Sequence, residues 1–111
     1  MTIEEVVFDR NRIKARGGWI ELEHPIQDAF LEDGRLFVLF DPDSGSWPSA
    51  NMICIGLNGE RLWVAEFPER TREDYYYLIS SRKPLVVTSF SSYDCELDPE
   101  TGKIVSREFF K

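Results

Sequence analysis

Residues 29–40 decide the fold, and they read AFLEDGRLFVLF. The pair Asp33-Gly34 separates two apolar runs, and both residue types tolerate the positive φ that a two-residue type I′ turn requires. The pattern therefore predicts a β-hairpin. Its second run, Leu36 to Phe40, holds no polar residue, which predicts a strand that is covered on both faces or lies centrally in a sheet.

Similar turn signals continue along the chain. Asn58-Gly59 lies between two apolar runs and also suits a type I′ turn. In residues 98–102, Pro99 presets the first turn position and Gly102 takes the left-handed position before the next strand. Apolar and acidic side chains alternate along residues 93–98, as they do in a half-buried strand.

Further strands are expected toward the N-terminus at residues 6–8, 12–14 and 19–22, with Gly17-Gly18 as a turn. Residues 68–74 allow a short helix with Thr71 as its N-cap, but the strand preference of the tyrosine-rich run that follows favours a loop and then a strand. The prediction is an all-β fold, an antiparallel meander of roughly eight to ten short strands.

The chain has 111 residues, of which 42% are hydrophobic and 30% charged. This length predicts a single domain, 1–111, with an N-terminal β segment at 1–24 and two further units at 25–67 and 68–111. No apolar run approaches the ~18 residues of a membrane-spanning helix, and the acidic start lacks the features of a secretory signal. We therefore expect a cytoplasmic protein that does not bind membranes.

Acidic residues outnumber basic ones, 20 against 13, which gives a net charge of −7. Most of the excess lies in residues 20–50, where seven acidic residues accompany one basic residue, Arg35. This charge argues against nucleic acid as a partner. It is typical either of a small soluble domain or of a surface that steers a basic protein toward itself.

A weak internal repeat relates residues 26–63 to residues 75–105. Each part holds four strand-like runs, and Cys54 and Cys95 occupy matching places, 41 residues apart. Gly59 and Gly102 match when the second turn is allowed two extra residues. Units of about 40–45 residues with four strands each are typical of β-propeller blades.

Residues 93–105, YDCELDPETGKIV, resemble the inner hairpin of quinoprotein-type (pyrroloquinoline-quinone-like) β-propeller repeats, in which Leu-Asp precedes a Thr-Gly-Lys turn. Residues 58–63, NGERLW, resemble the same turn with its following tryptophan. The resemblance covers residues 26–111 and implies two blade-like four-stranded units. A closed propeller needs about four blades or more, so neither a closed ring nor its quinone site is expected, and we expect no cofactor. In general make-up the chain also resembles small single-domain bacterial proteins.

Few residues are suited to catalysis. Cys54 and Cys95 lie in predicted strands among apolar neighbours, so we expect buried thiols and no disulfide. The single histidine, His24, precedes Pro25 at a strand end, where a surface or capping role is expected. A cysteine–histidine pair formed in space would make a small enzyme, but the flanking residues do not support one. The chain is therefore predicted not to be an enzyme.

The loop after residue 40 is the first candidate for binding. Asp41 and Asp43 lie near a glycine, but the further acidic ligands of a calcium loop are missing, so a polar turn is favoured and no metal is expected. Trp47 in the same loop is either an exposed aromatic anchor or a cover for one end of the sheet.

The triplet Tyr75-Tyr76-Tyr77 is the second candidate. In a strand, one of the three must face away from the others. An exposed Tyr76 beside Arg70 and Arg72 would form a recognition surface, whereas a cross-strand aromatic pair that stabilises the sheet is the structural alternative.

A third pattern is a run of cations at every second position, Arg10, Arg12, Lys14 and Arg16. The overall acidity favours a solvated edge strand, or docking against Glu21 and Glu23, over nucleic-acid binding.

These features favour a non-enzymatic protein-binding domain, in concrete form an acidic immunity- or antitoxin-type protein that caps a basic partner. The second hypothesis is a structural β domain that forms homodimers through exposed sheet edges. The third is a small enzyme that uses a cysteine.

Overall fold

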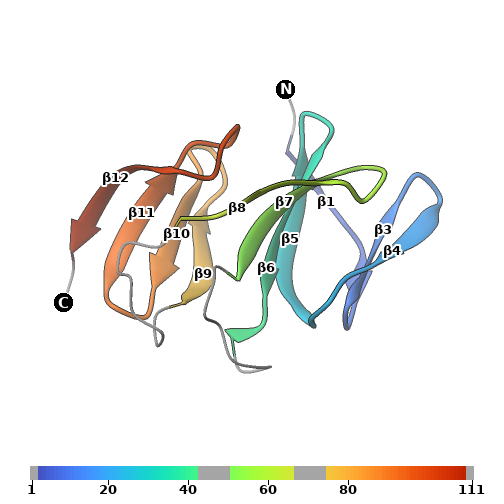
Figure 1. Cartoon of the computed structure of the whole chain (residues 1–111), viewed down its shortest axis with the longest axis horizontal. Helices are drawn as coiled ribbons and strands as arrows, with labels where there is room; N and C mark the ends of the chain where they lie inside the picture. The colour runs from blue at the N-terminus through green and yellow to red at the C-terminus, as the bar shows by residue number, and fades with distance from the viewer. Residues whose placement is uncertain (1–2, 43–50, 67–74, 110–111) are drawn as a thin grey trace.

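The computed structural model describes residues 3–42, 51–66 and 75–109. These residues form twelve β-strands and no α-helix, arranged in three antiparallel sheets (Figure 1). The predicted all-β antiparallel meander is confirmed. Strands exceed the expected number partly because the single strand expected at residues 6–8 is replaced by two, Ile3–Glu5 (β1) and Phe8–Asp9 (β2), which belong to different sheets.

The middle sheet has five strands in the order β1-β5-β6-β7-β8. Beside β1, its strands are Ile26–Glu32 (β5), Arg35–Phe40 (β6), Met52–Gly56 (β7) and Arg61–Val64 (β8). β5 and β6 are joined by Asp33-Gly34, whose φ angles of 56° and 74° match the predicted type I′ turn. At Asn58-Gly59 the turn differs from the prediction. Only Gly59 has a positive φ, 89°, and the Gly56 N–H donates to the Glu60 carbonyl at 2.8 Å, so a three-residue loop closes the hairpin.

The C-terminal sheet has four strands in the order β12-β11-β10-β9. In chain order they are Tyr76–Ser81 (β9), Val86–Ser89 (β10), Tyr93–Leu97 (β11) and Ile104–Phe109 (β12). Together with β5–β8 they make the two consecutive four-stranded meanders that the repeat predicted. Cys54 and Cys95 lie on the third strand of each meander, and both side chains are fully buried. The resemblance to quinoprotein-type blades remains a prediction.

The N-terminal sheet has three strands, β2, Arg12–Ala15 (β3) and Gly18–Glu21 (β4). The β3–β4 turn lies at Arg16-Gly17, one residue earlier than predicted, because Ala15 pairs with Gly18. The cation run does not form a single strand face, since Arg10 and Arg16 occupy positive-φ positions outside the strands.

Two cations of that run, Arg12 and Lys14, are exposed on β3 and lie over the Trp19 ring at 4.3 and 5.9 Å from its centroid. Arg12 is the cross-strand partner of Glu21, as the docking alternative predicted. Arg12 and Lys14 therefore contribute to the small sheet through their contacts with its next strand.

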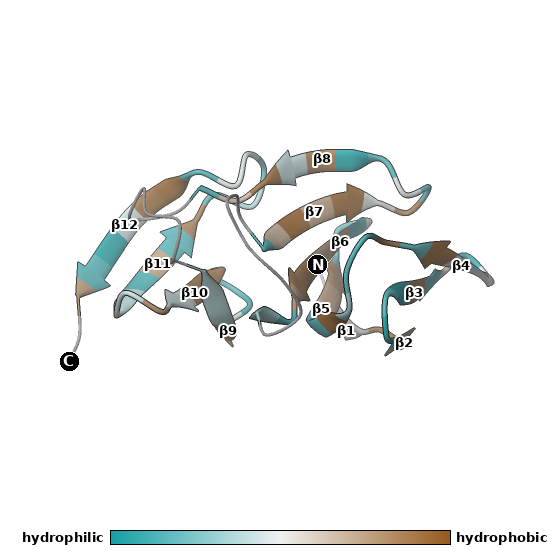
Figure 2. Ribbon diagram, turned by 60° about the horizontal axis from the view of Figure 1, so that its bottom comes forward, coloured by the Kyte–Doolittle hydropathy of each residue, from teal (hydrophilic) through white to brown (hydrophobic). Residues whose placement is uncertain are grey.

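The three sheets stack so that both faces of the middle sheet are covered (Figures 1 and 2). Phe37 and Leu39 of β6 pack with residues of the C-terminal sheet such as Val87. The alternate side chains Leu36 and Val38 pack with Ile13 of the N-terminal sheet. Every apolar residue of β6 is thus buried, which confirms the double coverage predicted from its unbroken apolar run.

Polar contacts as well as apolar ones join the middle and C-terminal sheets. The buried Asn51 side chain donates to the carbonyls of Phe40 and Tyr76, at 3.1 and 2.6 Å, and accepts the Tyr76 N–H at 2.9 Å. The Trp63 indole N–H donates to the Pro99 carbonyl at 2.9 Å. Both contacts satisfy polar groups at the seam between the two sheets, which also meet through apolar side chains.

Two further expectations from the sequence concern helices. The helix-or-loop alternative at residues 68–74 lies outside them. Within the described ranges, no helix has the length and hydropathy needed to cross a membrane.

Candidate functional site

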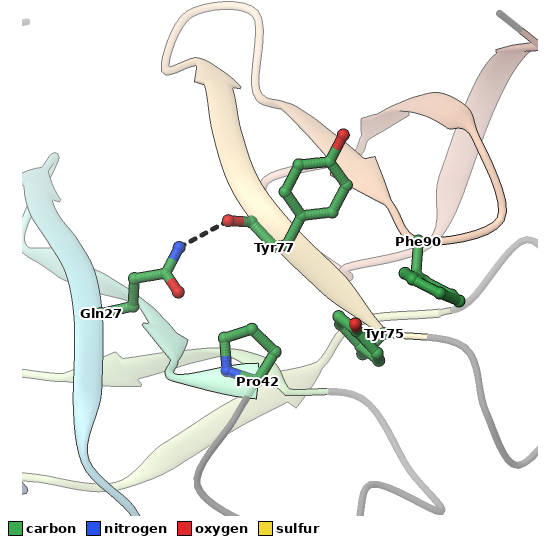
Figure 3. A pocket seen from close by; sticks show the side chains of 5 residues that line it. All are labelled: Gln27, Pro42, Tyr75, Tyr77 and Phe90. Carbon is green, nitrogen blue, oxygen red and sulfur yellow. Dashed lines mark hydrogen bonds between the residues drawn. The ribbon is translucent and has the colours of Figure 1, made fainter. Parts of the chain in front are cut away.

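An open groove lies at the seam between the middle and C-terminal sheets, with a volume of about 580 Å³ (Figure 3). The middle sheet contributes Gln27 from β5 and Pro42, which follows β6. The other wall consists of three aromatic residues on or beside β9 and β10: Tyr75, Tyr77 and Phe90. The groove is therefore built by segments that are far apart in the sequence.

A register irregularity between β9 and β10 decides which tyrosines reach the groove. Tyr76 pairs with Ser89 and Leu78 pairs with Thr88, so Tyr77 is an extra residue on β9. Such a β-bulge re-aims the side chains around it. Tyr76 is fully buried, whereas Tyr77 is 39% exposed and Leu78 is 47% exposed.

The aromatic wall is held by hydrogen bonds and ring contacts. The Tyr75 and Phe90 rings are stacked, with centroids 5.0 Å apart and planes 22° apart, and the Phe90 N–H donates to the Tyr75 carbonyl at 2.8 Å. Across the groove, the Gln27 amide donates to the Tyr77 carbonyl (Figure 3). The rings are thus positioned before any ligand arrives, although Phe90 is 60% exposed.

The described lining offers flat aromatic faces, one carboxamide and a proline ring. None of the described lining residues is cationic or a nucleophile of the cysteine or serine type. The acidic residues Asp28 and Asp41 are the sequence neighbours of Gln27 and Pro42. The described groove is therefore aromatic and uncharged, and acidic residues neighbour it in the sequence.

The predicted binding residues are only partly placed by the structure. Trp47, Asp43, Arg70 and Arg72 lie outside the described residues. Asp41 is half-buried, and its backbone N–H donates to the Pro25 carbonyl at 2.9 Å.

The prediction that Tyr76 lies at the surface is wrong, because its side chain points into the core beside the bulge. Its hydroxyl donates a hydrogen bond to the Glu66 carbonyl. The expectation that one tyrosine faces away from the others is correct, but the accessible ones are Tyr75 and Tyr77. Sequence reasoning missed Gln27, Pro42 and Phe90; an aromatic residue set among the serines of residues 89–92 was the available signal for Phe90.

The two cysteines are buried and form no disulfide, as expected. Burial raises the pKa of the Cys54 thiol to about 12, so this sulfur stays protonated and a poor nucleophile near neutral pH. His24 packs edge-on against Phe40, with centroids 5.4 Å apart. In the part of the chain that the structure describes, no group of three or more His, Cys, Asp or Glu residues is arranged to hold a metal ion.

The acidic excess of residues 20–50 is partly neutralised by other segments. Arg61 forms hydrogen bonds with both Glu23 carboxylate oxygens, one at 2.7 Å, and this interaction lowers the pKa of Glu23 below its ordinary value of 4.5. Lys83 lies 3.8 Å from Glu32. The negative field of this region is therefore weaker than composition alone indicates.

Comparison with known proteins gives one result. Residues 3–109 match the family model described as Domain of unknown function (DUF7957). Neither the curated proteins nor the solved structures that were compared include a match. Because the matched residues make up almost all of the 111, the chain belongs to the Domain of unknown function (DUF7957) family.

Proposed function

We propose that this chain is a non-enzymatic protein-interaction domain whose groove binds an extended, proline-containing segment of a basic partner. The observation that supports the proposal most is the pre-positioned aromatic wall formed by Tyr75, Tyr77 and Phe90. Accessible aromatic side chains that cluster in a groove are typical of binding sites.

Proline-rich segments suit this aromatic wall because of their shape and because they lose little conformational entropy on binding. They adopt the polyproline II conformation before binding, so little chain entropy is lost, and their rings pack flat against aromatic side chains. The backbone carbonyls of such a segment remain available as acceptors. The Gln27 amide carries a second N–H that suits one of them, since a carboxamide has two donor hydrogens.

The charge of the chain favours a basic partner. The net charge is −7, and the described residues of the groove lining include no cation. Complementary charge speeds association and rejects acidic competitors, although its effect falls as salt rises. The finer hypothesis, an immunity- or antitoxin-type protein in a bacterial cytoplasm, is the form of this proposal that the small size and acidity favour.

The proposal is tested with a synthetic peptide that combines several prolines with two or three arginines, titrated into the full chain and followed by NMR. We expect saturable binding that weakens with salt, and weaker binding of the peptide in which alanine replaces proline. Phe90→Ala and Tyr77→Ala should each weaken binding by roughly 5- to 30-fold, the cost of losing an aromatic anchor of about 1–2 kcal/mol.

The matched control is Val105→Ala, since Val105 is 62% exposed but lies on β12, away from the groove. It should bind the proline peptide like the unchanged chain. Equal affinity for the proline and alanine peptides, or equal affinity in all three variants, would refute the groove as the binding site.

A second candidate, homodimer formation through a sheet edge, is favoured by β12. Among the described strands β12 pairs only with β11, and its Val105 and Phe109 are 62% and 61% exposed. An edge strand of this kind offers its backbone to another chain. Light scattering decides the question: a dimer that Val105→Lys dissociates supports it, and a single 12.9 kDa species excludes it. No observation favours the cysteine-enzyme hypothesis, because the Cys54 thiol is buried and protonated.

A further inference from the structure

A second cavity, of about 230 Å³, lies between the same two sheets at the opposite end of β5. It shares no lining residue with the aromatic groove. Its apolar lining includes Phe37, Leu85 and Leu97, and four charged residues that the structure describes also line it: Glu32, Glu96, Arg82 and Lys83. At about 30 Å³ per water in the liquid, the cavity has the volume of roughly seven or eight waters, which suits a small organic molecule.

The cavity contains a buried carboxylate. Glu32, the last residue of β5, is only 8% exposed, and its Oε2 atom accepts no hydrogen bond from any residue that the structure describes. The Lys83 Nζ atom lies 3.8 Å away, which is an ion pair but too far for a hydrogen bond. A charged oxygen that is removed from water without a donor is costly, so this arrangement calls for an explanation.

The neighbouring arginine does not supply the missing donor. Arg35 is the direct cross-strand partner of Glu32, the position from which an ion pair would ordinarily form. Its guanidinium instead donates to the Pro99 carbonyl at 2.8 Å and lies 3.9 Å from Asp33. Among the described residues, Arg35 therefore leaves the buried Oε2 atom of Glu32 with its long contact to Lys83 and no hydrogen bond.

Two of the described residues that line the cavity are cations, Arg82 and Lys83. The Arg82 guanidinium lies over the Phe30 ring, 5.3 Å from its centroid, whereas Lys83 is placed to be exchanged. Its side chain is 62% exposed, and a long ion pair at such a site is weak because solvent screens it. A ligand ammonium that enters the cavity can displace the Lys83 ammonium into water and replace a 3.8 Å contact with direct charge-assisted hydrogen bonds.

We propose that this cavity binds an organic cation, an ammonium or guanidinium group on a short aliphatic stem. The cationic N–H groups donate to Glu32 while the stem packs against Phe37, Leu85 and Leu97. The same chemistry is present in a free alkylamine and in the lysine or arginine side chain of another protein. The inference does not rest on the proposed function of the aromatic groove.

The test uses the full chain labelled with ¹⁵N and titrated with n-butylammonium chloride. The reporter is the indole N–H of Trp63, which donates at 2.9 Å to the carbonyl of Pro99, a residue that lines the cavity. We expect a saturable shift of this resonance with butylammonium and none with n-butanol, which has the same stem without the cation. No saturable shift, or an equal shift with butanol, would overturn the inference.

Three variants of the chain test whether Glu32 binds the cation and whether Lys83 competes with it. Glu32→Gln should weaken binding roughly tenfold or more, because a charge-assisted hydrogen bond is lost. Lys83→Ala should strengthen binding several-fold, because the competing ammonium is removed. Lys14→Ala is the matched control: it changes the net charge equally, lies on β3 of the N-terminal sheet, and should leave affinity unchanged. Equal effects of Lys83→Ala and Lys14→Ala would show only a general charge effect and would overturn the exchange.

A second titration identifies the source of the cation. A blocked tripeptide with a central lysine should bind more tightly than butylammonium if the natural ligand is a protein side chain, and more weakly if it is a free amine. Binding of neither compound, in the unchanged chain and in Lys83→Ala, would refute both forms.

Discussion

Replacing Gly102 with alanine should damage the chain more than the same change at other turn glycines. Gly102 has a φ of +76°, which L-residues with a side chain rarely adopt. A Cβ atom added there would lie 2.3 and 2.6 Å from two ring atoms of Trp63. Ordinary carbon–carbon contacts lie at about 3.5–4.0 Å, so the tryptophan ring or the turn would have to move by roughly 1 Å.

The Trp63 ring has little freedom to move. It is 7% exposed, its N–H is bonded to Pro99, and its centroid lies 6.0 Å from that of Phe37. The left-handed backbone costs alanine about 1–2 kcal/mol, and forcing a methyl group into a packed core costs about 1–3 kcal/mol more. The Gly102→Ala variant should therefore lose about 2–5 kcal/mol of unfolding free energy.

Gly34→Ala is the matched control, because Gly34 has nearly the same φ, +74°, and its Cβ would meet nothing within 4 Å. It should lose only the backbone term of about 1–2 kcal/mol. Urea unfolding followed by circular dichroism measures both free energies. If the two variants lose the same amount within error, the contact between the turn and Trp63 contributes nothing, and the reasoning is wrong.

Three further predictions concern single side chains. Asn51→Ala should cost about 3 kcal/mol in urea unfolding, because it removes three hydrogen bonds to buried backbone groups of Phe40 and Tyr76. Cys54, with its pKa raised to about 12, should resist a thiol reagent at pH 8 until urea unfolds the chain; prompt labelling of the native protein would contradict its burial. The pair of Glu23 with Arg61 should stabilise the fold above pH 4.5 and lose this effect as pH falls through the lowered pKa. Glu23→Gln should therefore cost under about 1 kcal/mol at pH 7, and its stability difference from the unchanged chain should disappear in acid.

Local patterns predicted much of the fold because the order of apolar and polar residues in a strand indicates which of its faces are buried. The unbroken apolar run of β6 indicated coverage on both faces, since a strand with one wet face alternates with polar residues. The pairing of β1 with β5 left no such trace, because the two strands are separated by the whole N-terminal sheet. The turns at Asp33-Gly34 and Asn58-Gly59 differ because of a tertiary contact that the local sequence does not show. Leu57, in the loop before Gly59, packs against the core cluster that includes Ile13.

The candidate site was less predictable because it depends on contacts between meanders. Alternation showed that one tyrosine of the triplet faces away from the other two, but not which side is the core. That choice depends on the bulge at Tyr77 and on Asn51, whose side chain holds both backbone groups of Tyr76. Gln27 lies 50 residues from Tyr77, so no spacing rule links them.

The double coverage of the middle sheet matters during synthesis, because its two covering sheets are made at different times. The strands of the N-terminal sheet are all synthesised before β5. The face of the middle sheet that packs against them can therefore be covered as soon as it forms. The opposite face, with Phe30, Phe37 and Met52, packs against the C-terminal sheet, whose strands are translated last. Until the chain has been extended past Leu97, the nascent protein presents a bare apolar sheet surface to the ribosome exit and to its neighbours. We expect fragments that end near residue 66 to depend on chaperones for solubility, while the finished chain does not.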